Sequence, residues 1–360
     1  MNKVYKFVLG ILALTLLLVL GKERLNASST GTNDKDIYFY NWGNYVDPEV
    51  LKDFEEETGY NVIYETFDSN EAMMAKIEQG KTYYDLAFPS EYTVEMMRDK
   101  GLLEKLDHSK IVGLDNIDQR FLDQAYDPGN EYSIPYFWGT FGIIYNTEKY
   151  SEADVDSWAN LWDPKFEGEI LSFDGARETL GIGLLKKGYS LNEKNEKILR
   201  EVKNDLVPFM SNVKALLADE IRMYMGQGEA DIGITFSGEA AMAQDMNENL
   251  AYHIPKEGSN IWFDTMVIPK TSRNRKGAYA LISYFLRPDI AARNADYVWY
   301  ATPNKKAMDL IDEEAREDKT LYPNDEIIDK LEVFKDLGKE TTILYNDLFL
   351  DLKIAPQSEE

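Results

Sequence analysis

Short clusters of aromatic residues beside carboxylate or amide side chains recur along this chain. Four of the six tryptophans lie in such clusters: Trp42 in YFYNWGNY, Trp138 in PYFWG, Trp262 in IWFD and Trp299 in YVWYATPN. Aromatic faces attract positive charge, and carboxylates pair with ammonium groups. Each aromatic taken alone is more often a core residue. If the fold gathers these segments, however, they would form a pocket suited to an organic cation.

The IWFD segment places a ring and a carboxylate two residues apart. On a strand, Trp262 and Asp264 would point to the same face, which is the local arrangement that an alkylammonium group requires. The spacing of Trp158 and Trp162 in SWANLWDPKFEG has a different meaning. Residues four apart share one face of a short helix, so these two tryptophans predict a packing pair.

Other chemistries have weaker support. The chain has no cysteine, and His108 and His253 are far apart, so no metal-binding motif is present in the sequence. Ser237 lacks the glycine two positions before it that a nucleophile elbow requires. Asp174 and Glu178 could act as an acid–base pair, and a surface-anchored hydrolase that uses them is the alternative from another class. Acidic residues are also favoured at helix starts by the macrodipole, so we expect no enzyme, no metal and no cofactor.

Charge and length limit the function classes further. Acidic residues number 64 against 39 basic ones, which gives a formal charge of −25. Nucleic-acid binding rests on neutralisation of phosphates by Lys and Arg, so we expect no nucleic-acid partner. A chain of 360 residues is long enough for about two domains.

The N-terminus predicts export. Lys3 and Lys6 precede an apolar stretch over residues 7–20, which is typical of a secretory leader. We expect residues 1–27 to be a signal peptide or an uncleaved signal anchor, because the apolar run is close to the minimum for spanning a bilayer. Residues 28–36 are polar and predict a flexible tether. The body of the protein is therefore expected outside the cytoplasm, at the cell membrane or in the periplasm.

The elements that must position these residues alternate between strand and helix. The pattern predicts strands over residues 37–40, 62–66, 85–88, 142–146, 169–172, 231–235 and 264–268. It predicts helices over residues 48–58, 70–79, 93–101, 176–187, 219–227, 237–247 and 276–286. Such alternation favours an α/β fold with parallel strands, in which ligands bind beyond the carboxyl ends of strands. Several aromatic and acidic clusters follow strand ends, as this rule requires.

Several segments in this order resemble the extracellular spermidine/putrescine-binding proteins of ATP-driven polyamine importers. The segments are YFYNWGNYV, ETGYNVIYETFDSNEAMMAK, YDLAFPSEY, YSIPYFWGT, SWANLWDPKFEG, FDGARETLG, GEADIGITFSGEA, PKEGSNIWFDTMVIPK, LISYFLRPD and YATPNKKA. The resemblance extends from about residue 37 to at least residue 353. It implies a protein that captures a polyamine and passes it to the membrane permease of an ABC importer.

The resemblance also implies a two-lobed periplasmic-binding-protein fold, in which each lobe is a mixed sheet flanked by helices. The lobes are hinged around a central ligand cleft. Residues 37–139 and 264–308 would form lobe 1, and residues 140–263 and 309–360 would form lobe 2. Chain crossings are expected near Gly139 and Asp264.

The same resemblance assigns the ligand contacts. Trp42 and Tyr45 would line the first-lobe wall, Ser90 and Tyr92 would offer hydroxyls, Glu178 would bind one ammonium beside Arg177, Phe236, Trp262 and Tyr300 would supply aromatic faces, and Asp264 would pair with an inner ammonium. Four positions depart from the family pattern: Gly43 replaces a hydroxyl residue, Gly175 a second Asp, Phe236 a Trp and Phe334 a Gln. Asp174, Glu91 and Glu239 are candidate replacements for the acid missing at position 175.

Two rivals remain within the class of binding proteins. One is a carrier of another organic cation, and the other is a carrier of ferric iron, for which Tyr83 and Tyr84 could supply phenolate ligands. Adjacent residues on a strand point to opposite faces, which disfavours shared ligation by this pair.

Overall fold

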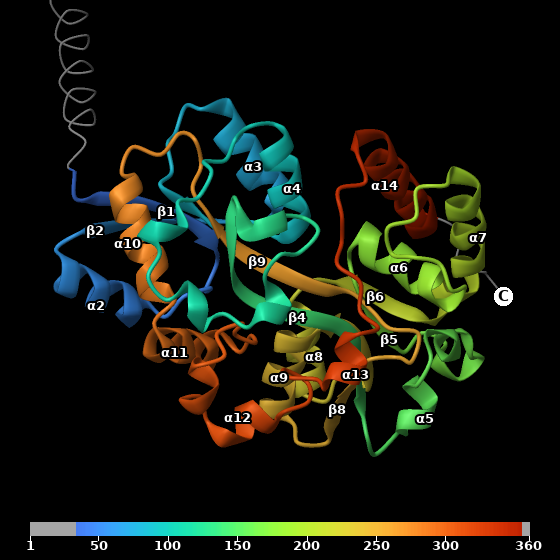
Figure 1. Ribbon diagram of the computed structural model, residues 1–360. Coiled ribbons are helices and arrows are strands. Elements are labelled where there is room, and N and C mark those ends of the chain that lie inside the picture. The colour runs from blue at the N-terminus through green and yellow to red at the C-terminus, as the bar shows by residue number, and fades with distance from the viewer. Residues whose placement is uncertain (1–33, 355–360) are drawn as a thin grey trace, which may run out of the picture.

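The computed structural model describes residues 34–354. Its framework is a nine-stranded sheet. Eight strands follow the order β2-β1-β3-β9-β4-β7-β5-β6, and the ninth, β8, pairs with β4. Helices cover this framework, so the predicted α/β class is confirmed (Figure 1). The leader and most of the expected tether lie outside the described residues.

The first strands and helices form where local signals predict them. Strand β1 (Asp36–Trp42) pairs in parallel with β2 (Asn61–Phe67) and β3 (Leu86–Ala87). Between β1 and β2 lies helix α2 (Pro48–Thr58), which is capped by the Asp47 side chain and ends at Gly59 with φ 70°. Helix α3 (Asn70–Gln79) is capped by Ser69 and ends at Gly80 with φ 63°. Side-chain acceptors satisfy the first amides, and glycine allows the left-handed terminus.

Two antiparallel strands connect the halves of the molecule. The first part of β4 (Ser133–Asn146) pairs with β9 (Ile261–Val267), and its last residues pair with β7 (Ile232–Phe236) and β8 (Leu250–His253). Figure 1 shows β4 and β9 running through the middle of the molecule. The sequence predicted only the second part of β4, over residues 142–146, and placed the start of β9 three residues too late. Proline and glycine disfavour strand interiors, but at Pro135 and Gly139 the pairing with β9 outweighs this local preference.

The remaining elements complete the two halves. Further strands are β5 (Ile170–Phe173) and β6 (Val213–Leu217). Further helices are α4 (Glu91–Asp99), α5 (Glu152–Val155), α6 (Ala176–Lys186), α7 (Glu196–Asn212), α8 (Glu220–Gly226), α9 (Ser237–Met246), α10 (Arg275–Phe285), α11 (Pro288–Val298), α12 (Glu313–Glu317), α13 (Asp325–Ile328) and α14 (Lys339–Ile354). Among residues 34–354, no helix is both long enough and apolar enough to cross a membrane.

The buried apolar residues form separate cores. The largest core contains residues between 37 and 138 and between 261 and 311, and the second contains residues between 141 and 234 and between 334 and 352. A smaller third core contains residues of β4, β5, α8 and α9. Trp158 and Trp162 both pack with the second core, as their spacing predicts.

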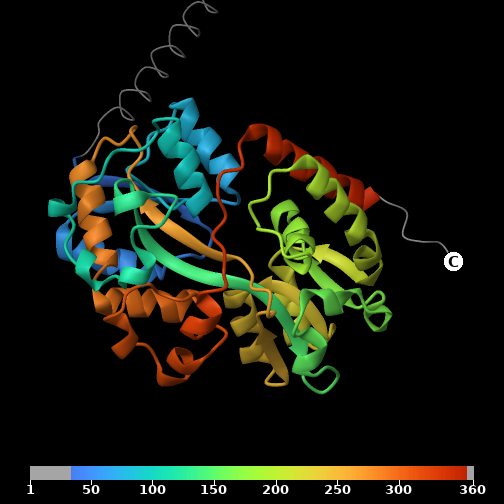
Figure 2. The same ribbon diagram turned by 45° about the vertical axis from the view of Figure 1, so that its right-hand side comes forward.

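The segment before α14 is divided between the two cores. Tyr322 and Leu331 pack against the first core, whereas Phe334 and Leu337 belong to the second. The Tyr322 hydroxyl accepts a hydrogen bond from the Thr302 amide at 3.2 Å. The chain therefore passes from one core to the other near residue 333, and Figure 2 shows this segment running between the two halves toward α14.

Candidate ligand-binding site

Asp264 is the centre of a buried polar cluster. Its side chain lies on β9, the residue is only 6% exposed, and its two carboxylate oxygens accept hydrogen bonds from Tyr45 Oη at 2.5 Å and Ser90 Oγ at 2.6 Å. Burial raises the pKa of Asp264 to about 6, although both hydrogen bonds act to lower it. Three chain segments that are far apart in sequence thus meet at one carboxylate, whose described hydrogen bonds both come from neutral hydroxyls.

Aromatic rings surround this carboxylate. The Trp262 ring meets the Tyr300 ring edge to face at a centroid distance of 5.0 Å, and it meets the Phe236 ring in the same way at 6.2 Å. Tyr45 extends this wall, with its ring 5.7 Å from that of Tyr300. A Cβ atom at Gly139 would lie 2.5 Å from the Trp262 ring, so glycine at this position is what allows the indole to lie across β4.

A polar strip leads from Asp264 toward the second half of the molecule. Asn70, at the start of α3, donates from Nδ2 to Ser90 Oγ and to Tyr92 Oη, both at 3.0 Å. Tyr92 packs against the second core although α4 belongs to the first half. Asn70 thus aligns both hydroxyls, and the sequence analysis missed it because its place at a helix start explains it equally well.

Glu178 lies at the far end of this strip, in the first turn of α6. A Cβ atom at Gly175 would lie 2.0 Å from Glu178 Oε2, so the carboxylate occupies the space that any other residue at 175 would fill. Burial raises the pKa of Glu178, while the charge of Arg177 acts to lower this pKa and that of Glu71 acts to raise it. Glu71, in the first turn of α3, is an acid that the sequence analysis did not single out.

Asp174 and Arg177, which are close to Glu178 in sequence, contact other parts of the chain. Asp174, a candidate replacement acid, instead forms an ion pair with Lys353 on α14 at 2.7 Å, and its side chain is 40% exposed. This arrangement also removes the proposed acid–base pair of Asp174 and Glu178. The Arg177 guanidinium lies 4.2 Å from the Phe334 ring centroid and donates to the Asn192 side chain. Arg177 therefore anchors the segment before α14.

Glu91 and Glu239, the other candidate acids, are both buried. Glu91 is 1% exposed and accepts a hydrogen bond from the Phe263 amide at 3.0 Å, so it holds β9 against the start of α4. Burial raises the pKa of Glu91 to about 8 and that of Glu239 to about 7. Glu239 lies beside Tyr300, whose hydroxyl donates to Glu239 Oε1 at 3.5 Å.

The tryptophans of the other aromatic clusters lie in different places. Trp42 is half-buried at the end of β1, and its ring packs on Phe67 at 4.5 Å. Trp138 is a core residue that contacts Phe121 at 4.8 Å, and Trp299 ends α11 with φ 62°. Of the four tryptophans, only Trp262 has a ring contact with the group around Asp264.

Tyr83 and Tyr84, the pair considered for iron, contact different parts of the chain and do not form a shared ligand site. The Tyr84 hydroxyl donates to Glu65 at 2.7 Å, whereas the Tyr83 ring packs edge-on against Tyr38 at 4.5 Å. Within the described part of the chain, no group of three or more His, Asp or Glu side chains has the arrangement to hold a metal ion.

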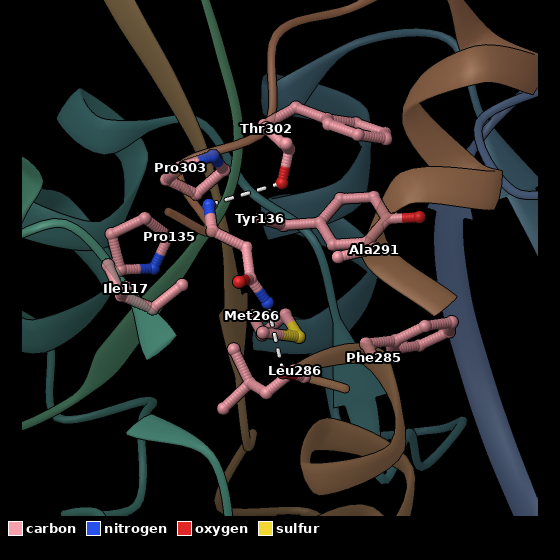
Figure 3. Close-up of a pocket in the computed structure, with 11 residues that line it drawn as sticks. Ile117, Pro135, Tyr136, Met266, Phe285, Leu286, Ala291, Thr302 and Pro303 are labelled. Carbon is pink, nitrogen blue, oxygen red and sulfur yellow. Dashed lines mark hydrogen bonds between the residues drawn. The ribbon is translucent and has the colours of Figure 1, made fainter. Parts of the chain in front are cut away.

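A small pocket beside β4 and β9 is not the ligand site. It lies between β4, β9 and α11 and is lined mainly by apolar side chains such as Ile117, Pro135 and Met266 (Figure 3). Its volume of about 10 Å³ leaves room for no more than a single water molecule. The pocket is therefore a packing feature behind the aromatic wall.

Comparisons with known proteins agree with this geometry. Residues 49–323 match the family described as bacterial extracellular solute-binding protein. The chain is 40% identical to the spermidine/putrescine-binding periplasmic protein of Escherichia coli K12 over 94% of this chain and 97% of the relative. It is 32% identical to the putrescine-binding periplasmic protein PotF of the same organism over 86% of this chain and 90% of the relative.

A solved structure has the same fold. The crystal structure of the spermidine/putrescine ABC transporter substrate-binding protein PotD from Streptococcus pneumoniae superposes with a TM-score of 0.82 at 51% identity, and the match covers 89% of this chain and 99% of that one. The family match over residues 49–323 includes Ser90, Trp262, Asp264 and Tyr300 of the site, whereas Tyr45 lies just before it. The chain belongs to the bacterial extracellular solute-binding protein family.

Proposed function

We propose that this protein binds a polyamine such as putrescine or spermidine and delivers it to the permease of an ABC importer. The observation that carries the proposal is Asp264, a buried carboxylate that accepts two hydroxyl hydrogen bonds and is surrounded by aromatic rings. A buried charge without a partner of opposite sign is costly. An ammonium group would supply that partner, and its methylene neighbours would pack against Trp262.

The names of the relatives support the same ligand class, since they state spermidine and putrescine. The separated ends of the site, at Glu178 and at Asp264, suit a ligand that carries ammonium groups joined by apolar links. Relatives of this kind bind solutes for transport, so we propose a binding role without catalysis.

We also propose how the protein works in transport. The two cores would act as lobes, with the first lobe extended to about residue 333 and the second resuming at residue 334. Strands β4 and β9 and the segment near residue 333 would form the hinge. Closure around a polyamine would exclude water, and the permease would recognise the closed form. The protein would act outside the cytoplasm, held at the membrane by the apolar stretch over residues 7–20.

Isothermal titration calorimetry with putrescine, spermidine and spermine tests this function. We expect saturable binding of at least one polyamine at one site per chain, together with a higher melting temperature in its presence, since a ligand that binds only the native state stabilises it. γ-Aminobutyric acid, which combines an ammonium with a carboxylate, is the matched negative control. No heat and no thermal shift with any of the three polyamines would disprove the proposal.

Replacing Trp262 with Leu should weaken polyamine binding moderately. The indole contributes cation–π attraction of about 0.5–2 kcal/mol, and leucine would retain part of the apolar packing. The matched control is Trp162→Leu, because Trp162 packs in the second core, far in sequence from the cluster, with its ring 5.1 Å from Phe209. If calorimetry gives the parent and Trp262→Leu the same polyamine affinity, the Trp262 ring does not contribute to ligand binding.

A further inference from the structure

Tyr45 reaches Asp264 from a loop. Residues 43–47 connect β1 to α2 and belong to neither element, and Asn44 among them has a left-handed backbone with φ 51°. The Tyr45 hydroxyl nevertheless donates to Asp264 Oδ2 at 2.5 Å. The regular hydrogen bonds of strands and helices do not fix such a loop. The direction of the Tyr45 side chain therefore depends on groups that other elements supply.

A β-bulge in β4 lies beside Asp264. The pairing of β4 with β9 shifts register between Pro135 and Phe137, so Tyr136 is an extra residue on β4, and Phe137 itself pairs with Asp264. Successive side chains of a regular strand point to opposite faces, yet the rings of Tyr136 and Phe137 lie only 4.1 Å apart. The Tyr45 ring lies 6.2 Å from the first ring and 5.3 Å from the second. The bulge thus brings two successive aromatic side chains to Tyr45, as bulges beside functional sites commonly re-aim side chains.

The Tyr136 hydroxyl holds the backbone of Tyr45. It donates to the Tyr45 carbonyl at 3.2 Å, and both residues are buried. Tyr64, on β2, acts in the same way at the start of the loop, since its hydroxyl donates to the Trp42 carbonyl at 2.9 Å. Two phenolic hydroxyls thus satisfy backbone carbonyls at this loop. Of the two, only the Tyr136 hydroxyl is bonded to the residue whose side chain contacts Asp264.

We propose that Tyr136 is a positioning residue, whose hydroxyl holds Tyr45 so that the Tyr45 hydroxyl points at Asp264. The effect of Tyr136 on ligand affinity rests on the proposed polyamine function, whereas its effect on Asp264 does not. The hydrogen bond from Tyr45 acts to lower the pKa of Asp264. A displaced Tyr45 would therefore leave this carboxyl more readily protonated, and the ammonium of a ligand would meet a partner that is less ionised.

Carbon-13 NMR of the Asp264 carboxyl in the ligand-free, full-length protein gives the first measurement. Tyr136→Phe removes the hydroxyl but keeps the ring contacts with Phe88 at 4.5 Å and Phe285 at 5.5 Å (Figure 3). We expect the pKa of Asp264 to rise by about half a pH unit or more in this variant. Tyr45→Phe should raise it at least as far, and the double variant should titrate like Tyr45→Phe alone, because Tyr136 acts only through Tyr45. Other titratable groups that interact electrostatically with Asp264 remain in place: Glu91, Tyr126 and Tyr300.

Calorimetry gives the second measurement. Tyr136→Phe should weaken the binding of spermidine and putrescine alike, by about three- to tenfold, and should add nothing to the loss in Tyr45→Phe. The matched control is Tyr145→Phe, because Tyr145 is a buried tyrosine near the other end of β4, in the second core. This control should leave the pKa of Asp264 and both affinities at the parent values.

Two results would overturn the inference. One is a parent-like pKa of Asp264 in Tyr136→Phe, whatever the melting temperature of the variant, because a hydroxyl that only stabilises the fold would not move this pKa. The other is a loss of affinity in the double variant that equals the sum of the two single losses. Absence of polyamine binding by the parent protein would instead contradict the proposed function, and the NMR titration would still decide the role of Tyr136.

Discussion

Replacing Asp264 with Asn should weaken polyamine binding more than any other single change in the site. The loss of one partner of a buried charge pair costs about 2–5 kcal/mol. Asparagine keeps the shape of the side chain, but it leaves the ligand's ammonium without a counter-charge in a site closed by Trp262. Its Nδ2 would also replace an oxygen that accepts from Tyr45 or Ser90. Calorimetric titration of parent and variant with spermidine measures this loss.

The same substitution should not harm the ligand-free protein. Burial raises the pKa of Asp264 to about 6 from the ordinary value of 3.8, so the ionised form destabilises the folded state relative to the unfolded one. This destabilisation is absent below the unfolded pKa and is complete above about pH 6. We therefore expect Asp264→Asn to melt at the same temperature as the parent at pH 7.5, or higher. Asp245→Asn, at an exposed position on α9, should change neither binding nor melting.

This pair of measurements separates a binding role from a folding role. A variant that melts at or above the parent temperature but no longer binds spermidine places Asp264 in the site. A folded Asp264→Asn protein with the parent's affinity for every polyamine would show that the site lies elsewhere. A variant that melts well below the parent would show that the hydroxyls of Tyr45 and Ser90 need the carboxylate for the fold.

The parts of the fold that could be predicted are those with local signals. Asp47 and Ser69 accept the first amides of their helices, and Gly59 and Gly80 end them, so α2 and α3 were predicted to the residue. Helix α7 was missed because Pro208 lies inside it, and packing against the second core outweighs the proline. The local pattern also gave no bounds for α14, because this helix has no clear polar face to mark one side. Such elements depend on tertiary packing.

The residues of the site likewise divide into those that local signals predict and those that tertiary packing places. The two-residue spacing of Trp262 and Asp264 indicated a shared face, and the structure places both in the group of rings and hydroxyls. The sequence could not show where side chains point at the start of α6. There Asp174 turns outward to Lys353, Arg177 packs on Phe334 and Glu178 folds over Gly175. These directions depend on α14 and on the segment before it, more than 150 residues away in the chain.

Polyamine binding should weaken steeply as the pH falls below about 6. In the ligand-free protein Asp264 titrates near this pH, because burial opposes its charge. The ammonium of a bound polyamine requires the ionised carboxylate, so binding shifts the carboxylate toward its charged form and releases any proton that it carries. Below the free pKa, each unit of pH then costs up to tenfold in affinity. We expect the spermidine Kd to be about tenfold higher at pH 5 than at pH 7.5.

The proton release itself can be measured. Titrations at pH 6 in buffers of different ionisation enthalpy give the number of protons released on binding, which we expect to be about one half from Asp264 at a pH equal to its pKa. Glu91 faces the Phe263 amide rather than the ligand, so its titration near pH 8 should affect stability more than binding. In Asp264→Asn the proton release that comes from Asp264 should be absent. If the spermidine Kd of the parent stays constant from pH 7.5 to pH 5, no carboxylate with a raised pKa binds the ligand.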